Sequence, residues 1–224
     1  MAKRLFDIVA SAIGLVVLSP VLLALAAWIA LDSPGPVFYR GVRGGLHNKP
    51  FRIFKFRTMV LNAEAIGGAS SADHDPRITS PGRLIRRYKL DELPQLLNVF
   101  KGDMSIVGPR PQILSYTTAY SGELADIMSV RPGMTDWASI WNADEGAVLA
   151  GAADPDHAYD VLINPTKLKL QLHYVRTRSF AEDVRIILAT IRRVLDPGYY
   201  PAELNDVPRL AKGAGAAIPS QTAS

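Results

Sequence analysis

Residues 7 to 32 read DIVASAIGLVVLSPVLLALAAWIALD, and this stretch decides how the rest of the chain is organised. No charged residue lies between Asp7 and Asp32, which leaves about 24 uncharged residues, enough for a helix that crosses a bilayer. Ser19-Pro20 lies at the midpoint, where proline removes a backbone N–H and clashes with the carbonyl four residues earlier. The stretch therefore predicts a kinked membrane helix that either spans the bilayer or turns back to the face from which it entered.

Basic residues flank this stretch on both sides. Lys3 and Arg4 precede it, and six basic residues follow it closely: Arg40, Arg43, Lys49, Arg52, Lys55 and Arg57. Basic residues near a membrane segment prefer the cytoplasmic side, so a spanning helix would carry one basic flank across, whereas a re-entrant helix keeps both inside. The Ser19 hydroxyl can also bond a carbonyl that Pro20 leaves free. Both topologies stay open here, because the charge rule is a bias.

Composition bounds the class of protein. The chain has 224 residues, of which 48% are hydrophobic, and this length predicts one moderate domain beside the apolar segment. The net charge of +4 is too mild to indicate a nucleic-acid partner. The absence of cysteine excludes disulfides, thiolate metal sites and cysteine nucleophiles. The apolar run is longer than the core of a cleaved signal peptide, so we expect it to be retained.

Downstream of the apolar run, the pattern predicts short strands followed by helices. The turn at 33–36, with two prolines and a glycine, ends the membrane segment. We expect strands at 37–40 and 51–56 joined by a hairpin loop, and another short strand at 137–141. Helices are expected at 62–66, 82–88, 93–100, 113–129, 165–177 and 181–195. The tail from residue 202 is rich in Ala, Gly, Pro and Ser and is expected to be disordered.

The helix expected at 181–195 is amphipathic. Apolar residues recur on one side, and Arg185, Arg192 and Arg193 mark the other. Such a helix either packs on the core of the domain or lies on anionic lipid at the membrane interface. A membrane-inserted N-terminus holds the domain near the bilayer, which gives weight to the second alternative.

The densest cluster of charges surrounds two adjacent carboxylates. Asp91 and Glu92 directly follow four cations, namely Arg83, Arg86, Arg87 and Lys89. Adjacent carboxylates repel, so one of their pKa values is expected to be raised unless a cation or a metal compensates. Arginine suits phosphate, and one carboxylate can attack phosphorus while another manages a proton. A solvated helix face with weak salt bridges is the alternative interpretation.

Two further segments could bind phosphate. Lys55 and Arg57 are two residues apart on an expected strand, so their side chains project from the same face. In Pro109-Arg110-Pro111 the prolines fix the backbone, and the preceding glycine allows a ligand to approach closely. The alternative interpretations are that Lys55 and Arg57 lie on the solvent-exposed face of a sheet and that residues 109–111 form a structural turn. The chain has no P-loop and no dinucleotide glycine fingerprint, so a nucleotide would be held in another way.

Taken together, these segments resemble the bacterial sugar transferases, the monotopic polyprenyl-phosphate phosphoglycosyl transferases. The resemblance runs in one order over about residues 3–200. It rests on KRLFD at 3–7, SP at 19–20, SPGPVFY at 33–39, FKFRTM at 54–59, LDELPQL at 90–96, GDMSIVGPRP at 102–111 and RPGMT at 131–135.

The resemblance implies transfer of a sugar 1-phosphate from a nucleoside diphosphate sugar, expected to be a UDP-sugar, to polyprenyl (undecaprenyl) phosphate. This is the first membrane step of exopolysaccharide, O-antigen or glycoconjugate synthesis. Family chemistry implies that Asp91 is the nucleophile, forming a covalent aspartyl phosphosugar, and that Glu92 assists proton removal from the acceptor phosphate. Mg²⁺ is the implied cofactor, bridging diphosphate oxygens and the Asp91 carboxylate.

The resemblance also implies binding roles for other residues. Ser19-Pro20 would break the membrane helix so that it re-enters the same face. The phosphate contacts would be Lys55, Arg57, Thr58 and Arg86, and the nucleotide contacts Pro109, Arg110 and Pro111.

The expected fold class is α+β, in three parts. A re-entrant membrane helix hairpin at 1–32 precedes a cytoplasmic phosphoglycosyl transferase domain at 33–201, with a short β-hairpin or sheet and several amphipathic interfacial helices. A disordered tail follows at 202–224. The expected location is the bacterial inner (cytoplasmic) membrane, with the domain facing the cytoplasm. Expected partners are the nucleotide sugar, polyprenyl phosphate and membrane lipid, while a homo-oligomer and other glycan-assembly enzymes remain open.

One segment departs from the family pattern. After the RPGMT motif many relatives carry Gly-Trp-Ala-Gln and then Gly-Arg, whereas this chain reads DWASIWNADEG at 136–146. An acidic stretch thus replaces the expected arginine, which puts one phosphate or sugar contact in doubt and indicates a different sugar preference. The rival hypotheses are a membrane-anchored, non-catalytic scaffold of polysaccharide assembly and a pyrophosphatase of nucleotide sugars.

Overall fold

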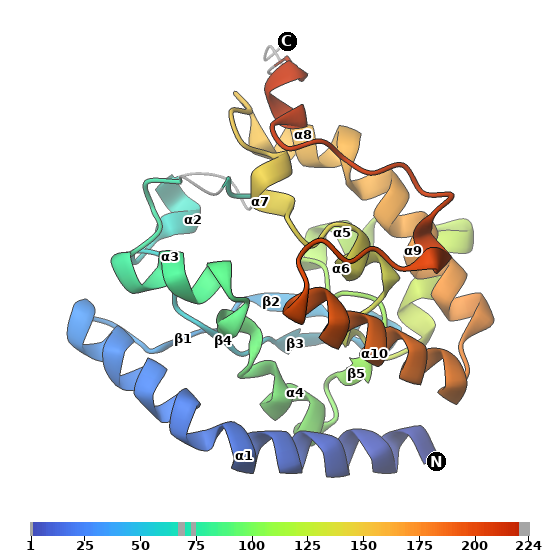
Figure 1. The fold of residues 1–224 in the computed structure, drawn as a ribbon, viewed down its shortest axis with the longest axis horizontal. Coiled ribbons are helices and arrows are strands. Elements are labelled where there is room, and N and C mark those ends of the chain that lie inside the picture. The colour runs from blue at the N-terminus through green and yellow to red at the C-terminus, as the bar shows by residue number, and fades with distance from the viewer. Residues whose placement is uncertain (1, 67–69, 73–74, 220–224) are drawn as a thin grey trace.

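The computed structural model describes residues 2–66, 70–72 and 75–219, and its fold mixes helices with short strands (Figure 1). Helix α1 (Ala2–Asp32) runs along one side of the molecule and bends near its middle (Figure 1). The α+β class is thereby confirmed, with a long apolar N-terminal helix beside a small mixed domain. By length and composition, α1 is the one helix in the described chain that could cross a membrane.

The strands form three short pairs. β1 (Phe38–Tyr39) pairs antiparallel with β4 (Lys55–Phe56), and β2 (Val42–Gly44) pairs antiparallel with β3 (Pro50–Arg52). β5 (Ser105–Val107) and β6 (Gly133–Thr135) are parallel. The predicted hairpin is confirmed, with the turn η1 (Leu46–Asn48) between β2 and β3. The first and fourth strands meet because the chain returns after that hairpin.

Helices form most of the remaining structure. In chain order they are α2 (Ala63–Ile66), α3 (Ser80–Arg87), η2 (Leu90–Glu92), α4 (Gln95–Lys101), α5 (Leu114–Thr118), η3 (Gly122–Ser129), α6 (Trp137–Trp141), α7 (Glu145–Val148), α8 (Pro155–Leu162), α9 (Asn164–Thr177), α10 (Phe180–Leu195), η4 (Ala202–Leu204) and η5 (Ala214–Ala217). The largest core cluster lies among α6 and α8 to α10, where Ile163, Tyr174 and Ile186 are buried. Helices α2, α3, α4, α9 and α10 confirm the predicted ones to within a few residues.

Two predicted elements are wrong. The strand expected at 137–141 is helix α6, because Asp136 caps it by accepting a hydrogen bond from the Ser139 N–H at 2.7 Å. The single helix expected at 113–129 is split into α5 and η3, since Gly122 has a φ of 56°, outside the helical region.

The tail differs from the disorder expected of it. Up to residue 219, where the description ends, it packs on the core through buried Leu204, and the Trp141 Nε1–H donates to the Pro208 carbonyl at 2.9 Å. These contacts come from apolar residues scattered in a sequence that is otherwise small and polar. Residues 220–224 lie outside the described part of the chain.

The N-terminal half of α1 is fastened to the domain by polar residues. The buried Asp7 carboxylate accepts hydrogen bonds from the Ser105 hydroxyl at 2.9 Å and from the Ile106 N–H at 3.0 Å, both on β5. Lys3 forms an ion pair with Asp183 of α10 at 2.5 Å. Arg4 donates to the carbonyls at the end of α4. These contacts turn one face of an apolar helix towards the domain.

The C-terminal half of α1 is fastened by one arginine. The buried Arg57 guanidinium donates to the carbonyls of Ser33 and Pro34, each at 2.7 Å, and to the Ile29 carbonyl at 3.3 Å. Ile29 lies in the last turn of α1, whose carbonyls have no partners within the helix, and Ser33 and Pro34 lie in the turn that follows. The cation therefore bonds both the end of the helix and this turn, and it meets the negative end of the helix dipole. Both halves of α1 therefore contact the same domain.

The bend in α1 has the cause that the sequence predicts. Pro20 lies inside the helix and supplies no N–H for the Val16 carbonyl four residues earlier. The Ser19 hydroxyl donates to that carbonyl at 2.7 Å, which satisfies it locally. The predicted role of the Ser19-Pro20 pair in the backbone is confirmed.

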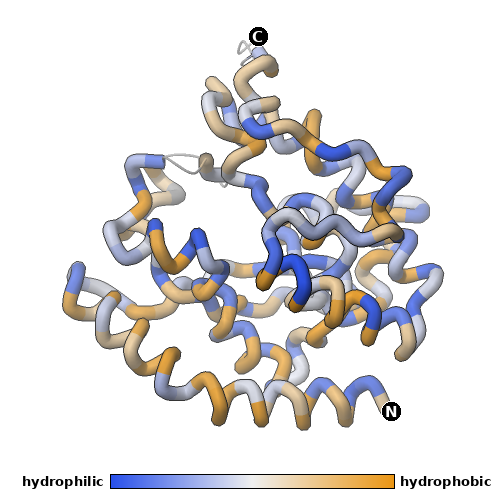
Figure 2. The backbone as a smooth tube through the Cα atoms, viewed as in Figure 1, coloured by the Kyte–Doolittle hydropathy of each residue, from blue (hydrophilic) through white to orange (hydrophobic). Residues whose placement is uncertain are grey.

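The outer face of α1 is apolar and exposed. Figure 2 shows that hydrophobic residues, in orange, make up most of this helix. Its exposed side chains include Leu5, Ile13, Val16, Val17, Leu23 and Leu31. Helix α10 packs on the core through Ile186 and Ala189, as the first alternative predicts, while Leu188, Ile191 and Leu195 are exposed. Phe6 and Phe180 stack edge to face with ring centroids 5.6 Å apart, which joins the two exposed faces. We call these exposed side chains of α1 and α10 the apolar face.

We expect Arg57→Met to lower the free energy of unfolding by roughly 2 to 4 kcal/mol, because it leaves the carbonyls at the end of α1 without their charged donor. Arg52→Met is the matched control, since Arg52 is exposed and makes one long bond to a carbonyl. Thermal unfolding in the same detergent measures both. Equal midpoints for the two variants would contradict the role of Arg57 in holding α1.

Candidate active site

Asp91 lies in η2 at the junction between α3 and α4. The preceding Lys89 has a φ of 56°, a left-handed conformation that turns the chain sharply after α3. Asp91 is buried, with 9% of its surface exposed, and burial raises the pKa of its carboxyl while the charge of Lys55 opposes this. Among the described residues, none donates a hydrogen bond to this carboxylate or forms an ion pair with it. Asp91 is therefore a desolvated carboxylate available to a ligand.

Glu92 has the opposite environment. Its carboxylate accepts from Lys55 Nζ at 2.9 Å and from Arg110 Nη1 at 2.9 Å, and Arg110 Nη2 forms a second, shorter contact. Burial raises the pKa of Glu92, but the charges of Arg110 and Lys55 outweigh it and hold this pKa well below its usual value. The two neighbouring carboxylates thus have pKa values shifted in opposite directions, an arrangement typical of groups with separate chemical roles.

The segment Pro109-Arg110-Pro111 follows β5 and is held in place by backbone contacts. A side chain on Gly133 would clash with the backbone of Gly108, so the two glycines let β5 and β6 meet closely. The Arg110 N–H donates to Asp136 Oδ2 at 3.1 Å. These contacts aim the Arg110 guanidinium at Glu92, and the pairing raises the pKa of Arg110.

The other predicted phosphate contacts, Arg57, Thr58 and Arg86, lie in different environments. Arg86 donates to the Ser71 hydroxyl, and its charge offsets part of the rise that burial causes in the pKa of Asp91. The Thr58 carbonyl accepts from Thr79 N–H at 3.0 Å, and Thr58 is buried. The guanidinium of Arg57 points at the end of α1 and bonds three carbonyls there. The structure thus brings Lys55, Glu92 and Arg110 into direct contact and places Arg86 near Asp91.

The donor set around Asp91 suits a metal only together with a substrate. The described residues hold no group of three His, Cys, Asp or Glu side chains that could bind a metal ion. Mg²⁺ commonly takes one or two carboxylates and completes its shell with substrate phosphates and water. The unpaired Asp91 carboxylate fits the first of these requirements, whereas Glu92 is occupied by two cations.

A second buried cation lies near this site and was not found by sequence reasoning. Lys167 in α9 is buried, and its ammonium donates to the Tyr159 hydroxyl at 2.6 Å. Burial lowers the pKa of Lys167 to about 8, and the charges of Glu145, Arg110, Asp136 and Glu92 also act on it. In the sequence this lysine belongs to an amphipathic helix with several charges, so nothing distinguishes it from a solvated one.

The acidic stretch that departs from the family pattern separates into two parts. Asp144 pairs with Arg193 of α10 at 3.1 Å. Glu145 accepts a hydrogen bond from Asn142 at 3.2 Å, and its charge acts on both Arg110 and Lys167. Of the three carboxylates in the stretch, Asp136 and Glu145 therefore act on Arg110, while Asp144 pairs with α10.

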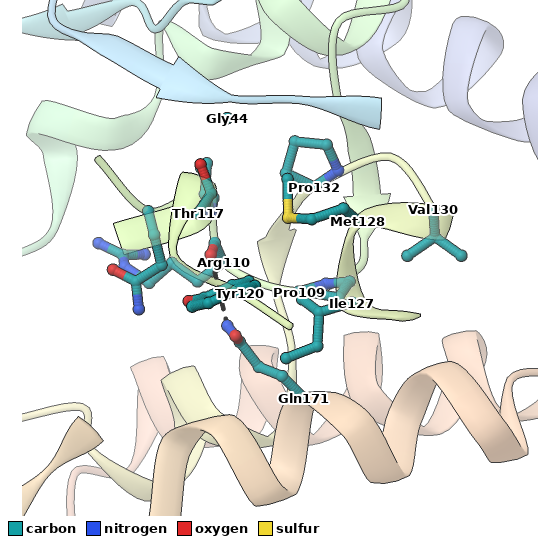
Figure 3. A pocket seen from close by; sticks show the side chains of 12 residues that line it. Gly44, Pro109, Arg110, Thr117, Tyr120, Ile127, Met128, Val130, Pro132 and Gln171 are labelled. Atoms are coloured by element: carbon teal, nitrogen blue, oxygen red, sulfur yellow. Dashed lines mark hydrogen bonds between the residues drawn. The ribbon is translucent and has the colours of Figure 1, made fainter. Parts of the chain in front are cut away.

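A small pocket lies behind the Pro109–Pro111 loop (Figure 3). It is lined by loop residues together with Thr117, Tyr120 and Gln171, and it has room for roughly one water molecule. Gln171 Nε2 donates to the Arg110 carbonyl at 3.3 Å, the dashed contact in Figure 3. This pocket supports the loop from behind and is too small for a nucleotide.

Comparison with known proteins identifies the family. The family model described as bacterial sugar transferase matches residues 1–197. The chain belongs to the bacterial sugar transferase family. This sugar transferase is also 39% identical over 198 residues to the UDP-N-acetylgalactosamine-undecaprenyl-phosphate N-acetylgalactosaminephosphotransferase of Aeromonas hydrophila. That match covers 86% of this chain and 43% of the relative, so the chain spans less than half of that longer protein.

Two shorter relatives are covered more fully. The uncharacterized sugar transferase EpsL of Bacillus subtilis (strain 168) is 39% identical over 86% of this chain and 87% of its own. The UDP-glucose:undecaprenyl-phosphate glucose-1-phosphate transferase of Caulobacter vibrioides is 36% identical over 87% of this chain and 70% of its own. The predicted family and the predicted enzyme class are confirmed for this sugar transferase.

We expect Lys167→Met to be more stable than the unaltered sugar transferase, because it removes the cost of burying an ammonium group. The folded pKa of about 8 lies below the usual lysine value of 10.5, so this cost is full below pH 8 and disappears as pH rises towards 10.5. The stability gain should therefore shrink over that interval. Thermal unfolding between pH 7 and 10.5 tests this, with the exposed Lys169→Met as control. A gain that is independent of pH would contradict it.

Proposed function

We propose that this sugar transferase moves a sugar 1-phosphate from a UDP-sugar to polyprenyl phosphate through an aspartyl phosphosugar on Asp91. The observation that carries the proposal is that Asp91 is a desolvated carboxylate with no partner among the described residues. The neighbouring Glu92 carboxylate instead forms ion pairs with Lys55 and Arg110. The names of the Aeromonas and Caulobacter relatives support the substrate classes.

In the first step, an Asp91 oxygen attacks the phosphorus that carries the sugar. A P–O bond to the nucleotide breaks, the electron pair leaves with UMP, and a mixed anhydride forms between Asp91 and the sugar phosphate. In the second step, a polyprenyl phosphate oxygen attacks the same phosphorus and frees Asp91. Burial of Asp91 favours the first step, since a poorly solvated carboxylate has less water to displace.

Lys55, Arg110 and Arg86 supply the positive charge that such a transfer requires. Lys55 and Arg110 are held together by Glu92, so they are in position before a diphosphate binds. The low pKa of Glu92 makes it a weak base. Its contribution to removing a proton from the acceptor is therefore secondary to its role in holding the two cations.

Magnesium fits this scheme as the proposed cofactor. The residue that would hold it is Asp91, with the remaining ligands from the substrate diphosphate and water. Bound there, the ion would neutralise charge on the diphosphate oxygens. Arg86 and Lys55 would orient the same oxygens from the protein side.

The proposed topology keeps both ends of α1 on the cytoplasmic side of the inner membrane. Three features support it: Asp7 and Arg57 fasten the two halves of α1 to the same domain, Pro20 bends it, and its apolar face points outward. A straight span would pull one of these halves away from its partners. The bent helix instead dips into one leaflet, which brings Asp91 to the depth of a lipid phosphate.

We expect Asp91→Asn to abolish release of UMP from a panel of UDP-sugars in the presence of Mg²⁺ and polyprenyl phosphate. The amide is a far poorer nucleophile and removes the charge that would hold the metal. The exposed Asp126→Asn serves as control and should keep full turnover, and circular dichroism checks the fold of both. Full activity of Asp91→Asn would refute the covalent mechanism. Loading of Asp91 releases at most one UMP per enzyme without lipid, so repeated turnover without lipid would indicate a pyrophosphatase. No release by the unaltered chain with any donor would favour a scaffold.

For the topology, we expect an N-terminal tag to be labelled only from the cytoplasmic side. Pro20→Ala restores the N–H that a straight helix needs, so part of the population should place the tag in the periplasm. Membrane-impermeant labelling of intact cells measures the fraction. The control is Ala10→Ser, a change in the same helix that keeps Pro20 and should leave the tag on the cytoplasmic side. Periplasmic labelling of the unaltered protein would refute the re-entrant helix.

A further inference from the structure

A cavity lies where the start of α1 meets β5 and the end of α9. Its volume is about 380 Å³, within the range of roughly 300 to 1,000 Å³ that is typical of small-molecule sites. Its lining includes four basic side chains, those of Lys3, Arg4, Arg131 and Arg178. Three separate parts of the chain thus bring four cations to the border of one space.

Three of these cations have no carboxylate partner. Among the described residues, Arg4, Arg131 and Arg178 form no ion pair and donate only to backbone carbonyls. Arg131 uses its Nε on the Gly102 carbonyl at 2.8 Å, and Arg178 makes one bond of 3.4 Å to the Val175 carbonyl. Because a guanidinium has five N–H donors, most of those on Arg131 and Arg178 are available to a ligand.

The carboxylates beside the cavity are already occupied. Asp7 accepts hydrogen bonds from β5, and Asp183 pairs with Lys3 and accepts from the Tyr174 hydroxyl at 2.7 Å. These two carboxylates balance only half of the charge of the four cations, so the surroundings of the cavity remain positive. Arginines with uncompensated charge around a space favour a phosphate, which accepts forked hydrogen bonds.

The cavity adjoins the apolar face. Two of its lining residues, Arg4 and Arg178, are each followed two positions later by a phenylalanine. These two rings, Phe6 and Phe180, contact each other edge to face, and Leu5 next to Arg4 is exposed. A molecule with an anionic head and apolar chains can therefore bond the arginines while its chains lie along the apolar face.

The cavity is separate from the candidate active site. Its lining does not include Lys55, Asp91, Glu92 or Arg110. Arg4 bonds carbonyls at the C-terminal end of α4, whereas Asp91 precedes the N-terminal end of that helix. Helix α4 has 7 residues, so its two ends are about 10 Å apart. A phosphate held in the cavity is therefore out of reach of Asp91.

We propose that this cavity binds the phosphate headgroup of an anionic membrane phospholipid and so fastens the start of α1 to the cytoplasmic leaflet. The proposal rests on the proposed membrane topology and is independent of the chemistry of Asp91. Basic pockets beside membrane helices on the cytoplasmic side are typical sites for such headgroups. A zwitterionic headgroup fits less well, because it carries an ammonium group that the surrounding cations repel.

The test uses the full chain in detergent and native mass spectrometry, which counts bound lipids. Dioleoyl phosphatidylglycerol and dioleoyl phosphatidylcholine are titrated separately, and glycerol 3-phosphate is added as a competitor. We expect one phosphatidylglycerol to bind about tenfold or more tightly than phosphatidylcholine. Glycerol 3-phosphate at the same concentration should not displace it, because this competitor lacks acyl chains.

Arg131→Gln combined with Arg178→Gln should remove most of this preference, since each cation beside a lipid phosphate contributes roughly fivefold in affinity. Lys169→Gln combined with Arg185→Gln is the matched control, because these two exposed residues lie outside the cavity and removing them changes the net charge equally. Arg178→Gln alone breaks one long hydrogen bond, so it should keep the fold and lose roughly fivefold even where the double variant does not fold.

A preference for phosphatidylglycerol that survives these substitutions would overturn the proposal. An equal loss in the control pair would indicate diffuse attraction to surface charge and would overturn it as well. Binding of glycerol 3-phosphate as tight as that of the lipid would assign the cavity to a soluble phosphate instead. A raised KM for polyprenyl phosphate in Arg178→Gln, with kcat unchanged, would assign it to the acceptor. An unaltered chain that keeps the lipid preference but does not turn over would support this site and count against the proposed reaction alone.

Discussion

The fastening of both halves of α1 to one domain is the constraint on which the rest of the structure depends. Asp7 bonds β5 from the first half, and Arg57 bonds the Ile29 carbonyl at the end of the second half and two carbonyls in the turn that follows it. A charged group buried at an apolar helix is costly unless it is hydrogen-bonded, and both of these buried residues are. Because the helix is held along its length, its apolar face can only point outward, and the bend at Pro20 follows the curvature of the domain.

Glu92 has a comparable organising role in the candidate active site. It joins Lys55 from β4 and Arg110 from the loop after β5, two residues that are 55 positions apart in the chain. The pairing leaves Asp91 as the unoccupied carboxylate of the two, with its pKa raised by burial. Two adjacent acids in the sequence thus acquire different properties, because one is bonded by cations and the other is bonded by nothing in the described chain.

Sequence reasoning succeeded where a local rule governs the outcome. Pro20 and Ser19 act on the Val16 carbonyl within one helical turn, so their effect could be worked out from the chain alone. Sequence reasoning was less successful where the tertiary environment of a residue decides its secondary structure or its bonding partners. Residues 137–141 were predicted as a strand but form a helix that Asp136 caps. Arg57 was predicted as a phosphate ligand on a strand face, but its guanidinium bonds carbonyls at the end of α1 and just after it. Lys167 gave no signal, because its burial depends on α8 and on the Pro109–Pro111 loop.

The sequence by itself determined the apolar helix with its proline, the family, and the pair of carboxylates next to cations. Each of these depends on residues that are close together in the chain. The tertiary structure alone decided which carboxylate is free, which cations meet at Glu92, and which acidic residue of the divergent stretch pairs with α10. The physical reason is that burial and pairing set the charge state of an ionisable group, and both depend on residues brought together from separate parts of the chain.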